Sequence, residues 1–463
     1  MEKNVNKAAE GSAPRWLGQF AGAVKKKWAG FSEIVTHGNF RVACSMFLMG
    51  TGQMMYKQWA KGALYLLIQA GSFAYFILVG AADLFGLFTL GTVEANPWYG
   101  IEGDDSVLML ITGILSVIML ILYLALYAAN VKGTYETQKR VEAGKRPFTF
   151  LEDVKQLFDQ KFYKTVLFLP VLGVSVFSIL PIVFMILIAF TNYGDDIVPP
   201  RLVDWVGFEN FGKLVAVGEY ATTFFKIFGW NILWAVLSTG INYFGGLALA
   251  LLLNKSCVKG KVFWRFFPIL AYAIPGFITM LGFKFMFANG GPVNYYITQG
   301  GGDAIFFFGA NSTWPARFIG LMVNAWISIP SSMLLATGIL SNANKDQYEA
   351  ARIDGANAFQ QFWYLTLPFV VFATTPVILS QFIGNFNNFG VFYFLRSDVA
   401  ESAGYVLAND TDLLINWLYK MSIDNNYYSI GAAISLIIFL ITSVISLVVY
   451  IFSPSYRQEE TYR

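Results

Sequence analysis

Long apolar runs dominate this sequence and constrain its fold more than any other feature. Eight of them reach the roughly 20 residues that an α-helix needs to cross a bilayer. They lie at about 62–82, 107–130, 165–191, 228–254, 264–287, 317–340, 370–395 and 428–453. The 463 residues are 56% hydrophobic and only 13% charged, whereas soluble domains carry about twice that charge. We therefore predict an all-α polytopic membrane protein with about eight transmembrane helices.

The chain before the first long run is different. The apolar stretch Val42–Met55 is interrupted by Gly50 and Gly52 and is too short to span a bilayer. We predict a re-entrant or interfacial helix there. Residues 1–41 are polar, with three consecutive lysines at 25–27. They fit either an amphipathic helix on an anionic membrane face or a soluble basic tail, and the sequence leaves both open.

The charges between the runs set the orientation. Segment 131–164 holds eight lysines and arginines, and 254–262 adds three lysines. By contrast, 85–106 has four acidic residues and no basic one, and 288–315 has no basic residue either. The positive-inside rule places the two basic segments in the cytoplasm. The loop 341–369 is then cytoplasmic as well, and so are both termini if the short apolar stretch does not cross.

Uncharged hydrogen-bonding side chains recur at helical spacing in two of the runs. They are Asn324, Ser328 and Ser331 in the sixth run and Gln381, Asn385 and Asn388 in the seventh. Amides and hydroxyls pair with sugar hydroxyls, and aromatic rings such as that of Trp326 stack on sugar rings. The same groups also hold membrane helices together. Two matched stripes favour a path for a neutral polyhydroxylated solute over that alternative.

Several other classes of protein fit poorly. Gly144-Lys145 and Gly260-Lys261 lack the spacing of a P-loop, so we expect no ATPase site, no enzymatic activity and no cofactor of the chain's own. The net charge of +3 follows from the cytoplasmic loops and does not indicate nucleic-acid binding. Acidic residues are nearly absent from the centres of the runs, which argues against the alternative function, an ion-coupled secondary sugar transporter. Charged residues lie near run ends, where they can snorkel: Arg265, Lys284, Arg317 and Arg396.

The loop at 341–369 carries the most specific motif. It reads Glu349-Ala350-Ala351-Arg352-Ile353-Asp354-Gly355-Ala356 and continues through Phe362 to Leu367-Pro368. This pattern predicts a helix, a break at Gly355 in the left-handed conformation, and a second helix that Pro368 closes. It resembles the EAA loop of ABC-importer permeases, a cytoplasmic helix pair that docks into an ATPase subunit. The resemblance implies that Glu349, Ala350, Ala351, Asp354, Gly355 and Ala356 couple the chain to an ATPase.

Other segments resemble the larger maltose/maltodextrin permease (MalF type). They include Tyr272–Pro275, Val323–Trp326, Phe382–Phe389 and Ala403–Tyr405. The resemblance implies sugar contacts at Tyr272, Asn324, Ile327, Ser328, Gln381, Asn385 and Asn388. The enteric members differ at Ser328, Ser331 and Gln381, which leaves the length and linkage of the sugar open. The short 192–227 segment and the Gly50–Gln53 motif resemble the Gram-positive version, which lacks the large extracytoplasmic insert.

These resemblances imply a domain plan and a set of partners. Residues 1–61 form a cytoplasmic or interfacial segment, 62–164 two extra transmembrane helices and a basic linker, 165–453 the six-helix core of a type I ABC importer permease, and 454–463 a cytoplasmic tail. The chain would lie in a bacterial plasma membrane and move maltose- or maltodextrin-type oligosaccharides by alternating access. Its partners would be a second permease subunit (MalG type), an ATPase dimer that binds the ATP, and an extracellular sugar-binding lipoprotein.

Overall fold

The computed structural model describes residues 22, 25, 32–216, 218–255 and 257–452. The proposed N-terminal amphipathic helix and the C-terminal tail lie outside the described residues. Within the described part, the chain forms helices and three isolated β-bridges but no β-strand. It divides into two compact units, one of residues 1–184 and 199–203 and the other of residues 185–198 and 204–463. The predicted all-helical fold is confirmed.

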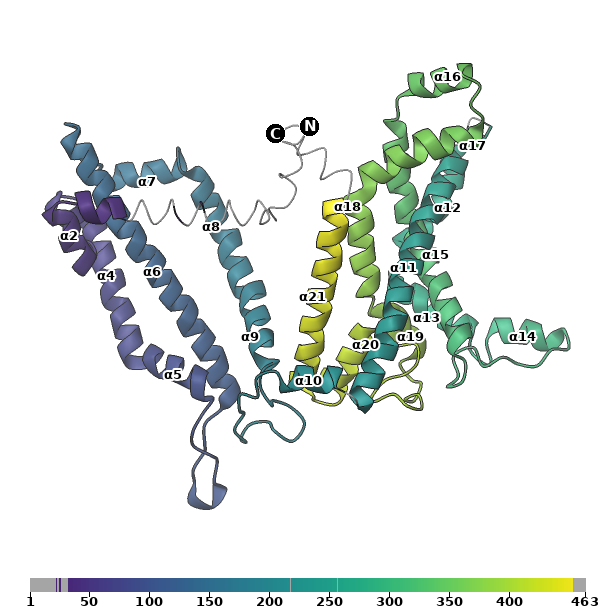
Figure 1. Ribbon diagram of the computed structural model, residues 1–463, viewed down its shortest axis with the longest axis horizontal. Coiled ribbons are helices and arrows are strands. Elements are labelled where there is room, and N and C mark those ends of the chain that lie inside the picture. The colour runs from purple at the N-terminus through teal and green to yellow at the C-terminus, as the bar shows by residue number, and fades with distance from the viewer. Residues whose placement is uncertain (1–21, 23–24, 26–31, 217, 256, 453–463) are drawn as a thin grey trace, which may run out of the picture. The chain divides into compact units, whose positions relative to one another are not determined.

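The first unit contains the long helical stretches Trp59–Thr89 and Ser106–Glu142 and most of a further one, Thr165–Ile188 (Figure 1). Its helices are α2 (Phe40–Phe47), α3 (Thr51–Met55), α4 (Trp59–Tyr75), α5 (Ala81–Thr89), α6 (Ser106–Glu142), α7 (Phe150–Phe158) and α8 (Phe162–Val174). A π-helical turn at Phe76–Gly80 joins α4 to α5, and another at Ser175–Ile179 joins α8 to α9 (Leu180–Ile188), which crosses the unit boundary. A short 3₁₀ turn, Pro97–Tyr99, caps the loop between α5 and α6.

The short apolar stretch forms α2 and α3, and neither is long enough to span a membrane. Both pack against long helices of the same unit through buried polar groups. Asn130 of α6 donates to Ser45 O (3.0 Å) and accepts from the backbone N–H of Gly50 (3.1 Å). Gly50 has a φ of 86°, and a Cβ there would lie 2.0 Å from the carbonyl oxygen of Gly62. The Gly50–Gln53 motif is therefore a tight, polar-lined turn.

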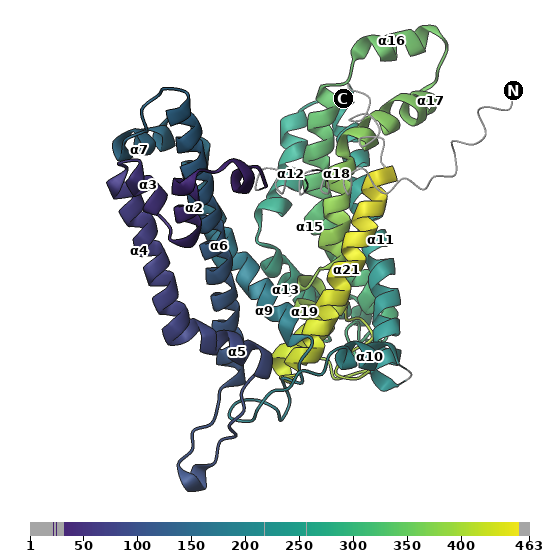
Figure 2. The same ribbon diagram turned by 60° about the vertical axis from the view of Figure 1, so that its left-hand side comes forward.

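The second unit is a helical bundle with α11, α15, α18 and α21 side by side (Figures 1 and 2). Its helices are α10 (Glu209–Val215), α11 (Glu219–Asn254), α12 (Lys261–Ala273), α13 (Gly276–Met286), α14 (Pro292–Gln299), α15 (Thr313–Ser341), α16 (Lys345–Ile353), α17 (Ala358–Gln361), α18 (Leu367–Phe386), α19 (Gly390–Arg396), α20 (Leu414–Tyr419) and α21 (Tyr428–Phe452). Two further π turns lie at Phe362–Thr366 and Lys420–Asp424.

Buried aromatic and aliphatic side chains from three helices fill one part of this bundle. Trp234 of α11 and Phe392 of α19 are fully buried, with ring centroids 4.9 Å apart. Val323 of α15 belongs to the same cluster. Burying large apolar side chains contributes about 1.5–3 kcal/mol each, so this cluster fixes α11, α15 and α19 as one packed group.

Among the described residues, seven helices are long and apolar enough to cross a membrane, or eight if one bent pair counts as a span. That pair corrects the continuous helix predicted at 264–287. Helices α12 and α13 meet at an angle of 92°. Pro275 causes the break, because it pushes Ile274 out of the helical region, to a ψ of 131°.

The second helix of the 341–369 loop also differs from its prediction. It does not stop at Pro368, because α17 passes through the π turn Phe362–Thr366 into α18 without a break. Pro368 lies two residues after this π turn, inside a continuous helical stretch, and the helix runs on past it although a proline has no backbone N–H to donate. The predicted break at Gly355 is confirmed, with a φ of 83°.

Candidate translocation path and coupling loop

Three of the predicted amide side chains meet in one hydrogen-bonded chain. Asn324 of α15 donates to Asn385 Oδ1 at 3.2 Å, and Asn388 donates to Asn324 Oδ1 at 3.1 Å. Asn385 in turn donates to the hydroxyl of Thr239 on α11 at 3.1 Å. Asn324 and Asn385 are buried, and Asn388 is half-buried. The chain links α11, α15 and the end of α18.

This arrangement supports the alternative that these amide side chains hold membrane helices together. Each of the three amides donates to another side chain, so in this conformation they hold helices together. The carbonyl oxygen of Asn385 also accepts from the indole N–H of Trp234 (3.1 Å), which ties its backbone into the aromatic core. In this conformation the side chain of Asn385 is buried and shielded from a solute.

The other predicted sugar-contact residues are less enclosed. Tyr272 is exposed and lies one residue before the end of α12, while Ile327 and Ser328 are half-buried on α15. Gln381 donates to the hydroxyl of Ser332 at 3.0 Å. Its Oε1 is buried without a hydrogen-bond partner within the part of the chain that the structure describes. A buried carbonyl oxygen of this kind can accept a hydrogen bond from a solute hydroxyl.

The break between α12 and α13 adds polar backbone beside Tyr272. The last carbonyls of a helix have no partner within that helix. Interrupted helices in transporters commonly present such groups to substrates.

Ser332 of α15 was not predicted from the sequence, although it lies four residues after Ser328 and therefore on the same face of the helix.

A buried ion pair closes one end of the bundle. Arg396, at the end of α19, has an exposed fraction of 0%, so the expectation that it snorkels to the surface is wrong. It donates to the carboxylate of Asp410 (2.6 Å), the hydroxyl of Thr411 (3.0 Å) and the carbonyl oxygen of Gly309 (3.0 Å). The guanidinium is buried because the loop after α19 folds back over it and supplies the carboxylate.

Neighbouring groups extend this cluster. The hydroxyl of Thr313 also donates to the Asp410 carboxylate, and Arg317 donates to the Asp410 carbonyl oxygen (2.5 Å) while stacking 4.0 Å from the Trp230 ring. Burial raises the pKa of Asp412, and the ammonium group of Lys420, 2.7 Å away, opposes that shift.

The loop with the Glu349–Ala356 motif lies at the other end of the bundle (Figures 1 and 2). Its short helices are tied to each other and to α18. The hydroxyls of Tyr348 and Thr366 are 3.1 Å apart, and Gln361 donates to the carbonyl oxygen of Ala356 at 2.8 Å. Asn357 and Gln360 form a capping box at the start of α17. The loop is therefore a braced element and not a flexible connection.

The surface of this loop is open to solvent. Of the predicted coupling residues, four are exposed and two, Ala351 and Ala356, are half-buried. The apolar side chains of Ile353 and Phe359 are 87% and 71% exposed. At its foot lies a cleft of about 570 Å³, lined in part by Asn254, Glu349 and Arg352. Exposed apolar groups beside a cleft are typical of a protein-docking surface.

Comparison with known proteins identifies the family. Residues 244–458 match the model of the binding-protein-dependent transport system inner membrane component. The chain is 33% identical over 420 residues to the galactooligosaccharides transport system permease protein of Bacillus subtilis, covering 89% of this chain and 96% of that protein. It is 34% identical over 421 residues to the maltodextrin transport system permease protein of the same organism, covering 89% and 95%. The chain is a permease of this family.

A solved structure shares the permease's fold. It is a crystal structure of a bacterial ABC transporter involved in the import of the acidic polysaccharide alginate. At 19% identity the match has a TM-score of 0.54 and covers 65% of this chain and 97% of that chain. The predicted family resemblance and the ABC-importer permease fold are thus confirmed.

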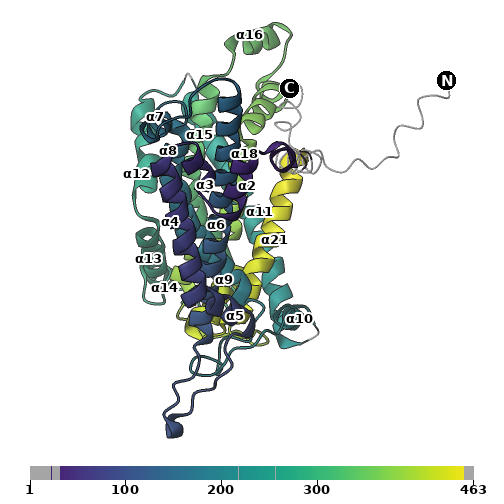
Figure 3. The same ribbon diagram turned by 90° about the vertical axis from the view of Figure 1, so that its left-hand side faces the viewer.

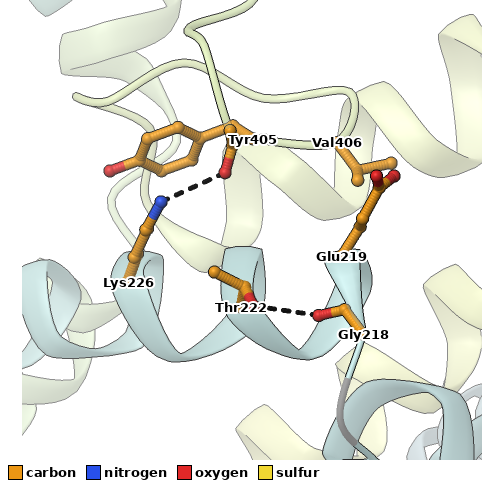
Figure 4. Close-up of a pocket in the computed structure, with 7 residues that line it drawn as sticks. Gly218, Glu219, Thr222, Lys226, Tyr405 and Val406 are labelled. Carbon is orange, nitrogen blue, oxygen red and sulfur yellow. Dashed lines mark hydrogen bonds between the residues drawn. The ribbon is translucent and has the colours of Figure 1, made fainter.

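A second cleft of about 480 Å³ lies where the first turns of α11 meet the loop after α19 (Figure 4). Lys226 donates to the carbonyl oxygen of Gly404 at 3.2 Å and lies 4.9 Å from the centre of the Tyr405 ring. The hydroxyl of Thr222 donates to the carbonyl oxygen of Gly218 at 2.9 Å. The two contacts of Lys226 hold the loop after α19 against α11, and the Thr222 bond lies within the first turn of α11.

Proposed function

We propose that this permease is a membrane subunit of an ATP-driven importer for maltodextrin-type oligosaccharides. The observation that carries the proposal is the similarity over 89% of the chain to permeases named for maltodextrin and for galactooligosaccharide transport. Both names describe neutral sugars several units long. Uncharged amides and hydroxyls, and the near absence of charge along the spans, suit such a solute.

The braced loop at 345–366 would couple the permease to its ATPase. Helix α16 would insert into a cleft on one ATPase subunit, with Glu349 making a polar or ionic contact and Gly355 providing the turn. Ala350, Ala351, Asp354 and Ala356 complete this surface. Its exposure and its apolar groups support the proposal. Because α17 continues into α18, movement of the loop would be passed directly to the helix that carries Gln381 and Asn385.

The sugar path would lie along α12, α15 and α18. Its contact residues would be Tyr272, Asn324, Ile327, Ser328, Gln381, Asn385 and Asn388. In the conformation described here, the amides that would bind sugar hydroxyls bind one another instead. The proposed cycle exchanges these bonds for bonds to sugar when the path opens, which keeps the buried amides satisfied in both states.

The permease would work in the plasma membrane of a bacterium, with both termini in the cytoplasm. The remaining subunits would be a second permease of the MalG type, an ATPase dimer that binds the ATP, and an extracellular sugar-binding lipoprotein. Segment 131–164, rich in lysine and arginine, supports this orientation.

The test is sugar uptake by the complete complex in proteoliposomes. We expect ATP-dependent uptake of maltotriose, loss of uptake in Asn385→Ala/Asn388→Ala with the ATPase still assembled, and uncoupled ATP hydrolysis in Gly355→Asp. Uptake of a galactooligosaccharide but not of maltotriose would overturn the substrate assignment. Uptake that survives the loss of both amides would show that they only hold the helices together. Uptake driven by an ion gradient without ATP would overturn the mechanism.

A further inference from the structure

The loop between α5 and α6 is a hydrogen-bonded hairpin. Asn96 and Ile101 exchange two backbone hydrogen bonds of 2.9 and 3.0 Å. Nearer its base, the carboxylate of Asp104 accepts the backbone N–H groups of Thr92 (2.7 Å) and Val93 (3.0 Å). Gly103 has a φ of 75°, and a Cβ there would lie 2.5 Å from Ala95 N. Residues 92–104 therefore form a defined arm.

The tip of this arm exposes two aromatic side chains. Trp98 is 95% exposed and Tyr99 is 81% exposed. The side chain of Asn96 accepts the backbone N–H of Trp98 at 3.2 Å and fixes the turn that presents them. Large aromatic side chains at an exposed turn are typical of binding surfaces, where tryptophan and tyrosine are enriched among the few residues that dominate the binding energy.

The arm is also acidic. It carries Glu94, Glu102 and Asp104, Asp105 follows directly at the start of α6, and residues 85–106 contain no lysine or arginine. The negative charge and the aromatic tip together specify a partner with a positively charged surface and an apolar groove.

The position of the arm within the first unit argues against the lipid bilayer as that partner. The arm projects beyond the ends of α5 and α6, roughly along the direction of α6 (Figures 1 and 3). Lys139 and Arg140 lie at the opposite end of α6. With that basic end in the cytoplasm, the arm points outward and carries its tip away from the membrane surface.

We propose that residues 92–104 form a docking arm for the extracellular sugar-binding lipoprotein of this transport system. The inference rests on the proposed function and on the family's dependence on a binding protein. The binding protein would meet the arm with a basic patch around a groove that receives Trp98 and Tyr99. Opposite charges would speed the encounter, and the aromatic side chains would slow dissociation.

The experiment uses the full complex in nanodiscs and the maltotriose-loaded binding protein of the same system. ATPase activity is measured against the concentration of binding protein. We expect Trp98→Ala/Tyr99→Ala to raise the half-maximal concentration at least 10-fold while the maximal rate stays unchanged. Glu94→Lys/Glu102→Lys should raise it as well and weaken its dependence on salt. Phe158→Ala, at an aromatic residue that is 66% exposed on α7, is the matched control and should change neither value.

A labelling experiment separates the protein partner from lipid. In a variant with Cys44 and Cys257 replaced by serine, Trp98→Cys should react with a membrane-impermeant maleimide added outside. The loaded binding protein should protect it. Protection by the bilayer alone, or reaction only from the inside, would overturn the proposal.

The ATPase measurement separates the two proposals. If the binding protein stimulates the wild type and the tip variant equally, the arm proposal alone fails. If sugar-loaded binding protein does not stimulate the wild type, the proposed function fails.

Discussion

Replacing Arg396 by methionine should destabilise the second unit strongly. The change removes an ion pair of 2.6 Å to Asp410 and two hydrogen bonds of 3.0 Å, all from a side chain with no exposed surface. The Asp410 carboxylate, which is 13% exposed, then loses its cationic partner and keeps the hydroxyl of Thr313 as a side-chain donor. Breaking a buried pair by removing one partner costs about 3–5 kcal/mol. We expect a loss of about 3 kcal/mol.

The assay is reversible unfolding of the purified permease in mixed micelles, followed by circular dichroism. Arg396→Met/Asp410→Asn should recover part of the loss, because it removes the orphaned charge together with its partner. Lys213→Met is the control, since its 3.0 Å pair with Glu209 is exposed and should contribute less than about 1 kcal/mol. The reasoning is refuted if Arg396→Met unfolds like the control, or if the double variant is no more stable than Arg396→Met.

Three further perturbations have defined outcomes. Tyr348→Phe removes the hydroxyl contact to Thr366 and should lower the sugar transported per ATP while the ATPase remains bound; an unchanged ratio would contradict the bracing role. Gly50→Ala should reduce the yield of folded permease, because its Cβ would lie 2.0 Å from Gly62 O; normal yield would contradict the tight turn. Hydrogen bonds from two backbone N–H groups hold the pKa of Asp104 below its ordinary value. The ionised carboxylate therefore stabilises the arm fully at any pH above the ordinary pKa, and this stabilisation is lost only as the pH falls through the lowered pKa. The arm should therefore resist proteolysis equally at pH 5 and pH 8, and Asp104→Ala should make it sensitive at both.

The long apolar runs predicted the helices well because hydropathy alone determines which segments can cross a bilayer. It does not report geometry within a run. The run at 264–287 is apolar throughout, yet Pro275 bends it by 92°. Likewise, Pro368 did not end its helix, because the helix passes through the π turn at Phe362–Thr366 and continues past the proline into α18.

The partners of polar side chains were harder to predict. Helical spacing placed Gln381, Asn385 and Asn388 on one face, but it could not show that Thr239 on another helix completes the network. For Arg396, nearness to the end of a run suggested a snorkelling side chain. Its burial depends on Asp410 in a loop that folds back, and hydropathy does not encode such a contact.

The most direct test of the central claim is maltotriose uptake into proteoliposomes that contain the permease, its partner permease and the ATPase. Binding protein is supplied on one side and ATP on the other. The account predicts uptake that requires ATP and the binding protein, and that Gly355→Asp abolishes while ATP hydrolysis continues. Uptake without ATP, or uptake unaffected by Gly355→Asp, would contradict it.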